Sequence, residues 1–89
     1  MGMDELRARL DGIDNQILAL LSKRAQIILQ VADFKQQHNI PAHIPARETA
    51  IFERLRTTNP GPLSGEAIER IYRIVIEEMR KFEEQHVTS

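Results

Sequence analysis

Two cationic side chains in the first third of the chain stand at positions where the surrounding pattern calls for apolar residues. Arg24 lies between Leu20 and Ile27, at a position where the apolar repeat predicts a leucine. Lys35 follows eleven residues later, which on an α-helix is three turns plus about 20°, so both cations lie on one side of the helix. If other charged residues converge on them, the result is a small pocket with several cations and few acids. Such a pocket suits a compact dianion.

Four further charged residues could complete this pocket. Arg7 precedes Arg24 by seventeen residues, so it lies about 25 Å along the helix axis and cannot reach the Arg24 site of its own chain. In a crossed or antiparallel dimer it could reach the partner's site. Arg47 and Glu48 open a second helix, and Glu83 continues the apolar series of the last helix, where a core residue is expected.

Each of these charges also has a purely structural interpretation. An arginine in an apolar repeat can fix register or oligomeric state, or it can extend its charged end to solvent, which explains Arg24 equally well. Charges near helix ends, such as Arg7 and Lys35, are commonly solvated. The charged pair at the start of the second helix can be a simple pair of helix-terminus charges with no role in a site. Glu83 can belong to a frayed tail.

Composition excludes several other classes of function. The 89 residues include no cysteine, which rules out disulfides and thiol chemistry. The three histidines, His38, His43 and His86, lack metal-ligand spacing, so we interpret them as structural and expect no metal or cofactor. A net charge of -1 with interleaved signs provides no basic surface for nucleic acid or a membrane. The charged N-terminal residues are unlike a signal peptide, and a cytoplasmic protein is expected.

One long apolar-periodic stretch organises the chain. Its first stripe steps alternately by four and three residues and comprises Leu6, Leu10, Ile13, Ile17, Leu20, Ile27, Val31 and Phe34. A second stripe beside it comprises Leu18, Leu21, Ala25, Ile28 and Ala32. A helix over about residues 4–37 is roughly 50 Å long, whereas a compact chain of this size is only about 30 Å across. The overhanging apolar surface predicts an obligate homodimer with the long helices packed across a symmetry axis.

Two shorter helices are predicted after the long one. A loop over residues 38–45 contains two prolines, and the second of them suits the first turn of a helix over about residues 46–57. Asn-Pro-Gly-Pro at residues 59–62 is a strong helix stop.

Ser64 is a good N-cap for a third helix over about residues 64–84, and residues 85–89 are expected to fray. The fold class is therefore all-α: three helices (long, short and medium) in a single domain, residues 1–89, forming an intertwined helical homodimer.

The residues that bear charge belong to a pattern that resembles the all-helical (type II) chorismate mutases. The first helix matches in Leu-Arg-x-x-Leu-x-x-Ile-Asp-x-x-Ile-x-x-Leu-Leu-x-x-Arg, followed eleven residues later by Lys35. The segment Pro-x-x-x-Pro-x-Arg-Glu, residues 41–48, resembles that family's loop and second-helix start, and residues 59–64 resemble its third-helix start. The resemblance implies the pericyclic rearrangement of chorismate to prephenate, in aromatic amino-acid or related secondary metabolism.

The resemblance also implies roles for the charged residues. Arg24, together with Arg7 from the partner chain, resembles the arginines that hold the two carboxylates of chorismate. Lys35 and Glu83 match groups beside the ether oxygen of the substrate. With Arg24 they form the implied catalytic set.

The remaining implied residues bind the substrate or support the site. Glu48 matches the acid that meets the ring hydroxyl, and Arg47 matches a second-helix arginine that supports the site. Met79 stands where the family commonly has a small or hydroxylated residue, and Ile44 stands where it usually has an aspartate. These two differences concern recognition of the substrate.

Alternatives remain open at this point. An isochorismate-pyruvate lyase shares the fold and the first-helix cations, although the acid that follows Arg47 favours a mutase. A 4-amino-4-deoxychorismate mutase is left open by Ile44, and a non-catalytic dimerisation or regulatory module would be a different class altogether. Retention of all the charged residues favours the enzyme.

Overall fold

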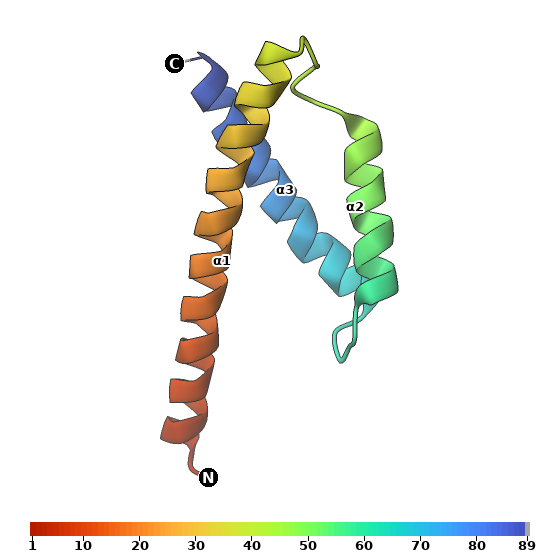
Figure 1. Cartoon of the computed structure of the whole chain (residues 1–89). Coiled ribbons are helices and arrows are strands. Elements are labelled where there is room, and N and C mark those ends of the chain that lie inside the picture. Colours follow the sequence, from red (N-terminus) through yellow and green to blue (C-terminus); the bar gives the residue numbers. More distant parts are fainter. Residues whose placement is uncertain (89) are drawn as a thin grey trace.

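The structure, a computed structural model, describes residues 1–88 and consists of three α-helices. They are α1 (Met3–Gln37), α2 (Pro45–Thr58) and α3 (Gly65–Thr88), joined by two short loops (Figure 1). No residue in the described range lies in a strand, so the predicted all-α class, with a long, a short and a medium helix, is confirmed. Within the same range, none of the helices is long and apolar enough to cross a membrane.

Helix α1 ends in a hydrogen-bonded reversal immediately after Lys35. The Ile40 N–H donates to the Lys35 carbonyl at 2.8 Å, and the Asn39 N–H donates to the Gln36 carbonyl at 3.4 Å. These two bonds form a Schellman motif, which requires a residue in the left-handed conformation. Asn39 supplies that residue with a φ of 55°, a conformation that asparagine tolerates better than most residues. The loop that follows is thereby directed back over Lys35.

The starts of α2 and α3 follow the signals in the sequence. Pro45 is the first residue of α2, a position where its missing N–H interrupts no helical hydrogen bond. The Ser64 hydroxyl accepts the Ala67 N–H at 3.1 Å, which confirms Ser64 as the N-cap of α3.

The predicted end of α3 is wrong. The helix was expected to stop near residue 84, but residues 85–88, which were expected to fray, are helical; Ser89 lies outside the described residues. The cause is a tertiary contact. His86 Nε2 lies 3.0 Å from Asp33 Oδ1 on α1, so the last turn of α3 is held against α1.

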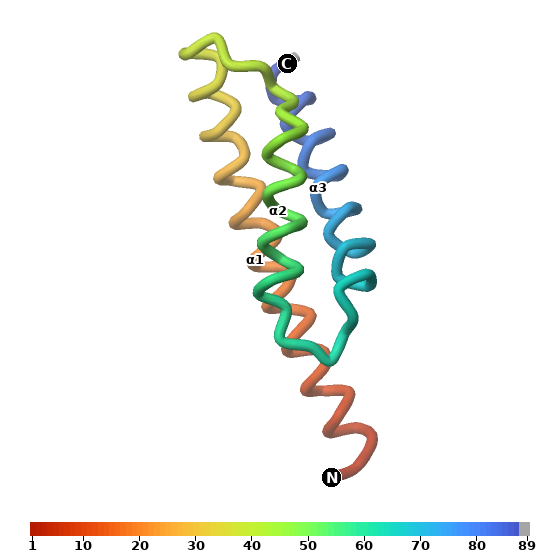
Figure 2. Tube along the Cα trace, turned by 90° about the vertical axis from the view of Figure 1, so that its right-hand side faces the viewer, coloured from red at the N-terminus to blue at the C-terminus, as the bar shows by residue number. Residues whose placement is uncertain are grey.

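Helix α3 packs against both other helices, whereas α1 and α2 share no contact within residues 1–88. The N-terminal part of α1 extends well beyond the other two helices (Figure 2). The molecule is accordingly elongated, with dimensions of 55 × 28 × 15 Å and a radius of gyration of 16.2 Å. A compact chain of this length would have a radius of gyration of about 12 Å.

The two apolar stripes of α1 have different environments. In the second stripe Leu18 is 64% exposed, but Leu21, Ala25 and Ile28 are partly buried and Ala32 is only 1% exposed. Every member of the first stripe is exposed, up to 65% at Leu20. Within the described residues, Ala32 and Ile51 are the only apolar side chains that are buried. A single chain therefore has almost no core of its own.

Candidate active site

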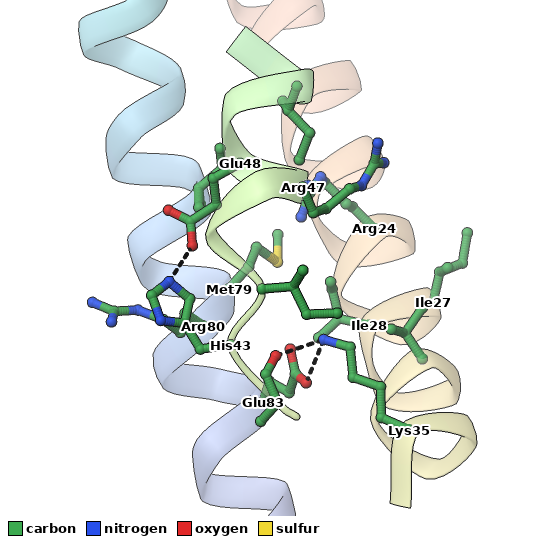
Figure 3. Close-up of a pocket in the computed structure, with 15 residues that line it drawn as sticks. Arg24, Ile27, Ile28, Lys35, His43, Arg47, Glu48, Met79, Arg80 and Glu83 are labelled. Atoms are coloured by element: carbon green, nitrogen blue, oxygen red, sulfur yellow. Dashed lines mark hydrogen bonds and ion pairs between the residues drawn. The ribbon is translucent and has the colours of Figure 1, made fainter. Parts of the chain in front are cut away.

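A pocket of about 460 Å³ lies where the three helices and the loop between α1 and α2 meet (Figure 3). Its volume is in the range typical of sites for small molecules. Helix α1 contributes one wall, the 38–44 loop and α2 a second, and α3 the floor. The lining side chains are Arg24, Ile27, Ile28, Val31, Lys35, Ala42, His43, Ile44, Arg47, Glu48, Ile51, Ile76, Met79, Arg80 and Glu83.

Arg24 presents an incompletely bonded cation to this pocket. The central carbon of its guanidinium lies 5.7 Å from the centre of the Tyr72 ring on α3, a distance at which the ring face attracts the charge. Its Nη1 atom is buried, and no described residue accepts a hydrogen bond from it. Buried nitrogen atoms of this kind are nearly always bonded in proteins. An acceptor from outside the chain would complete the bonding of Arg24.

Lys35 and Glu83 form a cross-helix pair at the other end of the pocket. Lys35 Nζ lies 3.2 Å from Glu83 Oε2 and donates to the Ala42 carbonyl at 2.6 Å. Glu83 is 7% exposed and is the one buried ionisable residue of the described chain. An ammonium group has three N–H donors, and these two contacts use two of them. The third is available to a bound molecule.

The loop, α2 and α3 bring an acid, a histidine and two further cations to the same space. His43 Nε2 lies 2.7 Å from Glu48 Oε2. Arg47 lies near Arg24 at the mouth of the pocket, and Arg80 lies beside His43 (Figure 3). Both arginines are exposed. The pocket therefore combines four permanent cations, two carboxyl groups and one histidine.

The residues predicted for the site separate into two groups. Arg24, Lys35, Arg47, Glu48, Met79 and Glu83 line this one pocket, as does Ile44. Arg7 does not; it is exposed near the N-terminal end of α1.

Sequence reasoning missed three contributors. His43 was interpreted as structural, although a loop that must return from Lys35 to α2 passes directly by the site. Neither Tyr72 nor Arg80 was proposed for the site. No pattern in the sequence distinguishes these last two from ordinary helix residues. Within residues 1–88, no group of three or more histidine or acidic side chains could hold a metal ion.

Comparison with known proteins adds an independent line of evidence. A family model described as chorismate mutase type II matches residues 6–84. The chain is 34% identical over 84 residues to a chorismate mutase of Methanocaldococcus jannaschii, covering 93% of this chain and 85% of that protein. It is 38% identical over 78 residues to a bifunctional chorismate mutase/prephenate dehydratase of Aquifex aeolicus, covering 83% of this chain and 22% of that protein. The chain thus spans about a fifth of the length of this bifunctional relative.

Solved structures of chorismate mutases are similar to this chain in fold. A chorismate mutase from Helicobacter pylori in complex with prephenate superposes with a TM-score of 0.89 at 36% identity, covering 98% of this chain and 94% of that one. A chorismate mutase from Thermus thermophilus has a TM-score of 0.89 at 27% identity, covering 92% of this chain and 93% of that one. The similarity extends over the whole arrangement of helices.

Proposed function

The chain belongs to the chorismate mutase type II family, and from that membership we propose that it is a chorismate mutase, an isomerase that converts chorismate to prephenate. A family member with 36% identity binds prephenate, which supports the same class of ligand here. The observation that carries the proposal is the buried, unbonded Nη1 of Arg24. A carboxylate of chorismate is an acceptor of the charge and size that this atom lacks.

The reaction requires the protein only to position the substrate and to stabilise developing charge. It is an intramolecular rearrangement with no proton transfer and no covalent intermediate. The site must hold the substrate in its compact conformer and stabilise the negative charge that develops on the ether oxygen. Arg24 serves the first task by fixing one carboxylate.

Lys35 and Glu83 serve the second task. Both groups converge on one point of the pocket, because their polar atoms lie 3.2 Å apart. The third N–H of Lys35 donates to the ether oxygen. Glu83 donates as well when it is protonated, whereas its ionised form repels the developing charge.

The remaining pocket residues recognise the ring. Glu48 accepts the ring hydroxyl, and Arg47 adds positive charge at the mouth. Met79 and Ile44 provide apolar surface to the ring. Because neither can form a hydrogen bond with the ring or its substituents, they leave selectivity between a hydroxyl and an amino substituent to Glu48.

The second carboxylate of chorismate is held by Arg7 of a partner chain. Within its own chain Arg7 is remote from the pocket, and the exposed first stripe of α1 offers a surface for a second copy. We therefore propose a homodimer with two equivalent sites, each completed by the other chain.

The test is loss of chorismate absorbance on adding purified protein, with the product identified. Wild type should yield prephenate, while Arg24→Ala should lower kcat/KM about 10²- to 10³-fold, as loss of a charge-stabilising donor does in other enzymes. Lys23→Ala, next to Arg24 but exposed, is the matched control and should resemble wild type.

Assays with related substrates distinguish the proposed activity from the alternative functions. Release of pyruvate from isochorismate would identify a lyase, and preference for 4-amino-4-deoxychorismate would identify the amino-substrate mutase. A folded dimer that turns over none of these substrates would indicate a non-catalytic module and overturn the proposal.

A further inference from the structure

His43, on the loop between α1 and α2, forms a hydrogen bond with Glu48, an acid of the pocket. Its Nε2 lies 2.7 Å from Glu48 Oε2, with the His43 side chain 50% exposed and that of Glu48 34% exposed. The pair also lines a smaller depression of about 210 Å³ on the α3 side, so it lies between the two. Glu48 Oε1 has no hydrogen-bond partner among the described residues.

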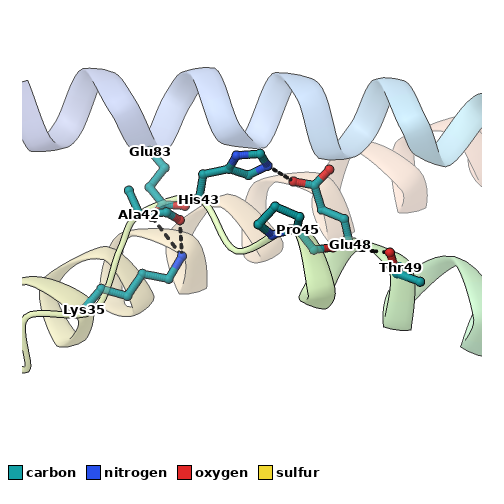
Figure 4. A network of polar contacts seen from close by, with 7 residues as sticks. All are labelled: Lys35, Ala42, His43, Pro45, Glu48, Thr49 and Glu83. Atoms are coloured by element: carbon teal, nitrogen blue, oxygen red, sulfur yellow. Dashed lines mark hydrogen bonds and ion pairs between the residues drawn. The ribbon is translucent and has the colours of Figure 1, made fainter.

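The backbone that carries His43 is itself fixed. Lys35 donates to the carbonyl of Ala42, the residue immediately before His43, at 2.6 Å (Figure 4). On the other side, Pro45 begins α2 and Glu48 follows within its first turn. The loop is therefore tied to α1 through Lys35 and to α2 through the His43–Glu48 bond. Glu48 is held by a segment that is anchored at the site.

We propose that His43 is a positioning residue that acts through Glu48 and makes the affinity for the dianionic substrate depend on pH. The proposal rests on the proposed function, in which Glu48 meets the ring hydroxyl. By occupying Oε2, His43 restricts the rotation of the carboxylate and leaves Oε1 for that hydroxyl. Without His43, the carboxylate is free to turn toward other donors nearby.

The charge of the pair follows from the protonation of His43. A neutral imidazole donates its N–H to Glu48 and the pair carries a charge of -1, whereas a protonated imidazole makes the same bond and the pair is neutral. Histidine changes charge between about pH 5 and 8. A dianion is repelled more by the charged pair, so KM should rise as His43 loses its proton.

Other charged groups near His43 do not remove this effect. The charged groups that line the two depressions with it are Arg73, Glu77, Arg80 and Glu83 of α3, Arg47 and Glu48 of α2, and Arg24 and Lys35 of α1. The arginines and the lysine keep their charge across the range in which histidine titrates. Acids that stay ionised over this range add a constant background. Apart from Glu83, whose ionisation is followed separately in kcat, the change in charge within this range therefore comes from the imidazole.

The experiment measures kcat and KM for chorismate from pH 5.5 to 8.5 in wild type, His43→Gln and His43→Ala. Glutamine keeps an N–H donor for Glu48 but carries no charge. We expect His43→Gln to keep kcat within about twofold and to have the high-pH KM of wild type at every pH. His43→Ala loses the bond as well, and its KM should rise about tenfold, as for loss of a charge-assisted hydrogen bond.

His38→Gln is the matched control. His38 stacks on Phe34 and bonds the Phe34 carbonyl, at the end of α1 and outside the pocket. Its variant should retain the wild-type KM profile. The inference is overturned if His38→Gln flattens the profile equally, or if neither His43 variant changes KM.

A double-mutant cycle separates positioning from a merely structural role. If His43 acts through Glu48, then adding His43→Ala to Glu48→Gln should change KM less than twofold further. Additive effects in the two backgrounds would contradict the inference.

A spectroscopic measurement keeps this inference separate from the proposed function. At a fixed pH, the imidazole NMR signals of His43 should change in Glu48→Gln while those of His38 do not. Wild-type protein that turns over no chorismate but shows this coupling would contradict only the proposed function. Active protein without the coupling would contradict only the role of His43.

Discussion

At the scale of single residues, the groups that face the pocket are left with unused bonding capacity. Arg24 has a buried nitrogen that finds no partner among residues 1–88, and Lys35 has one donor beyond its bonds to Glu83 and Ala42. A folded chain tolerates such groups where a ligand completes them. The free site is thus arranged for a molecule with several acceptor oxygens.

Glu83 leads to a prediction about pH. In the proposed mechanism its carboxyl assists the ether oxygen only as a hydrogen-bond donor, so kcat should be lower wherever the carboxyl is ionised. Glutamine donates a hydrogen bond and does not titrate. We expect Glu83→Gln to hold its activity at and above neutral pH with a flattened kcat profile, and Glu83→Ala to be poor throughout.

The measurement is kcat against pH for the three proteins, since the effect of His43 is expected in KM. Glu84→Gln, the same change one residue later at an exposed position, is the control and should keep the wild-type profile. Identical profiles for wild type and Glu83→Gln would remove Glu83 from the reacting end of the site.

Most of the charged residues that line the pocket could be predicted, because a charged residue is unexpected within an apolar series. Arg24 and Glu83 each interrupt such a series, and helical geometry then places Lys35 on the same side as Arg24. His43 could not be found in this way. Its bond to Glu48 depends on the path of a loop, and loop paths are not encoded in a periodic pattern.

At the scale of elements, the Schellman motif at the end of α1 determines where the loop passes. Asn39 is the residue in the left-handed conformation, which places the following segment within reach of Lys35. The sequence predicted this helix end from its prolines, but it did not identify Asn39. The long helices could be predicted from period alone, whereas the end of α3 depends on the tertiary pair of His86 with Asp33.

Asn39→Ala should therefore destabilise the protein by about 1 kcal/mol, since a side chain with a Cβ but no local hydrogen bonding is disfavoured at positive φ. Asn39→Gly, which has no such penalty, should be as stable as wild type or slightly more so. Urea unfolding at a fixed protein concentration measures both. Equal stability of the alanine and glycine variants would contradict the role given to the motif.

At the scale of the whole molecule, the dominant feature is the first apolar stripe of α1, which the described residues leave exposed. The first helix was expected to be longer than the diameter of a compact chain of this size. That comparison predicted that a second chain must cover the overhanging apolar surface. The sequence did not show which of the two stripes serves the chain itself, because both are apolar. In the structure α3 packs against α1, where the second stripe is covered from Leu21 onward, and all eight apolar side chains of the first stripe remain exposed.

We predict a dimer at micromolar concentration whose dissociation accompanies unfolding. Burial of the eight side chains of the first stripe would stabilise the assembly by something on the order of 10 kcal/mol per chain before entropic costs. The midpoint of thermal unfolding should then rise with protein concentration. Sedimentation that shows a stable, folded monomer would contradict this prediction.

Complementation tests whether the sites are shared. Arg7→Ala and Arg24→Ala homodimers should each be nearly inactive, and mixing them should restore activity because a heterodimer regains one intact site. Arg9→Ala, also exposed on the same turns of α1, is the control and should be active by itself. A mixture as inactive as its parents, with subunit exchange confirmed by mass, would argue against a shared site.

The near absence of a core within one chain also affects how the catalyst behaves on dilution. If only the dimer is folded and only the dimer has complete sites, the rate per milligram of protein is not a constant. Below the dissociation constant, the number of working sites falls with the square of the total concentration, so halving the protein quarters the rate. A cell could then tune flux through this step more steeply than in proportion to the amount of protein that it makes.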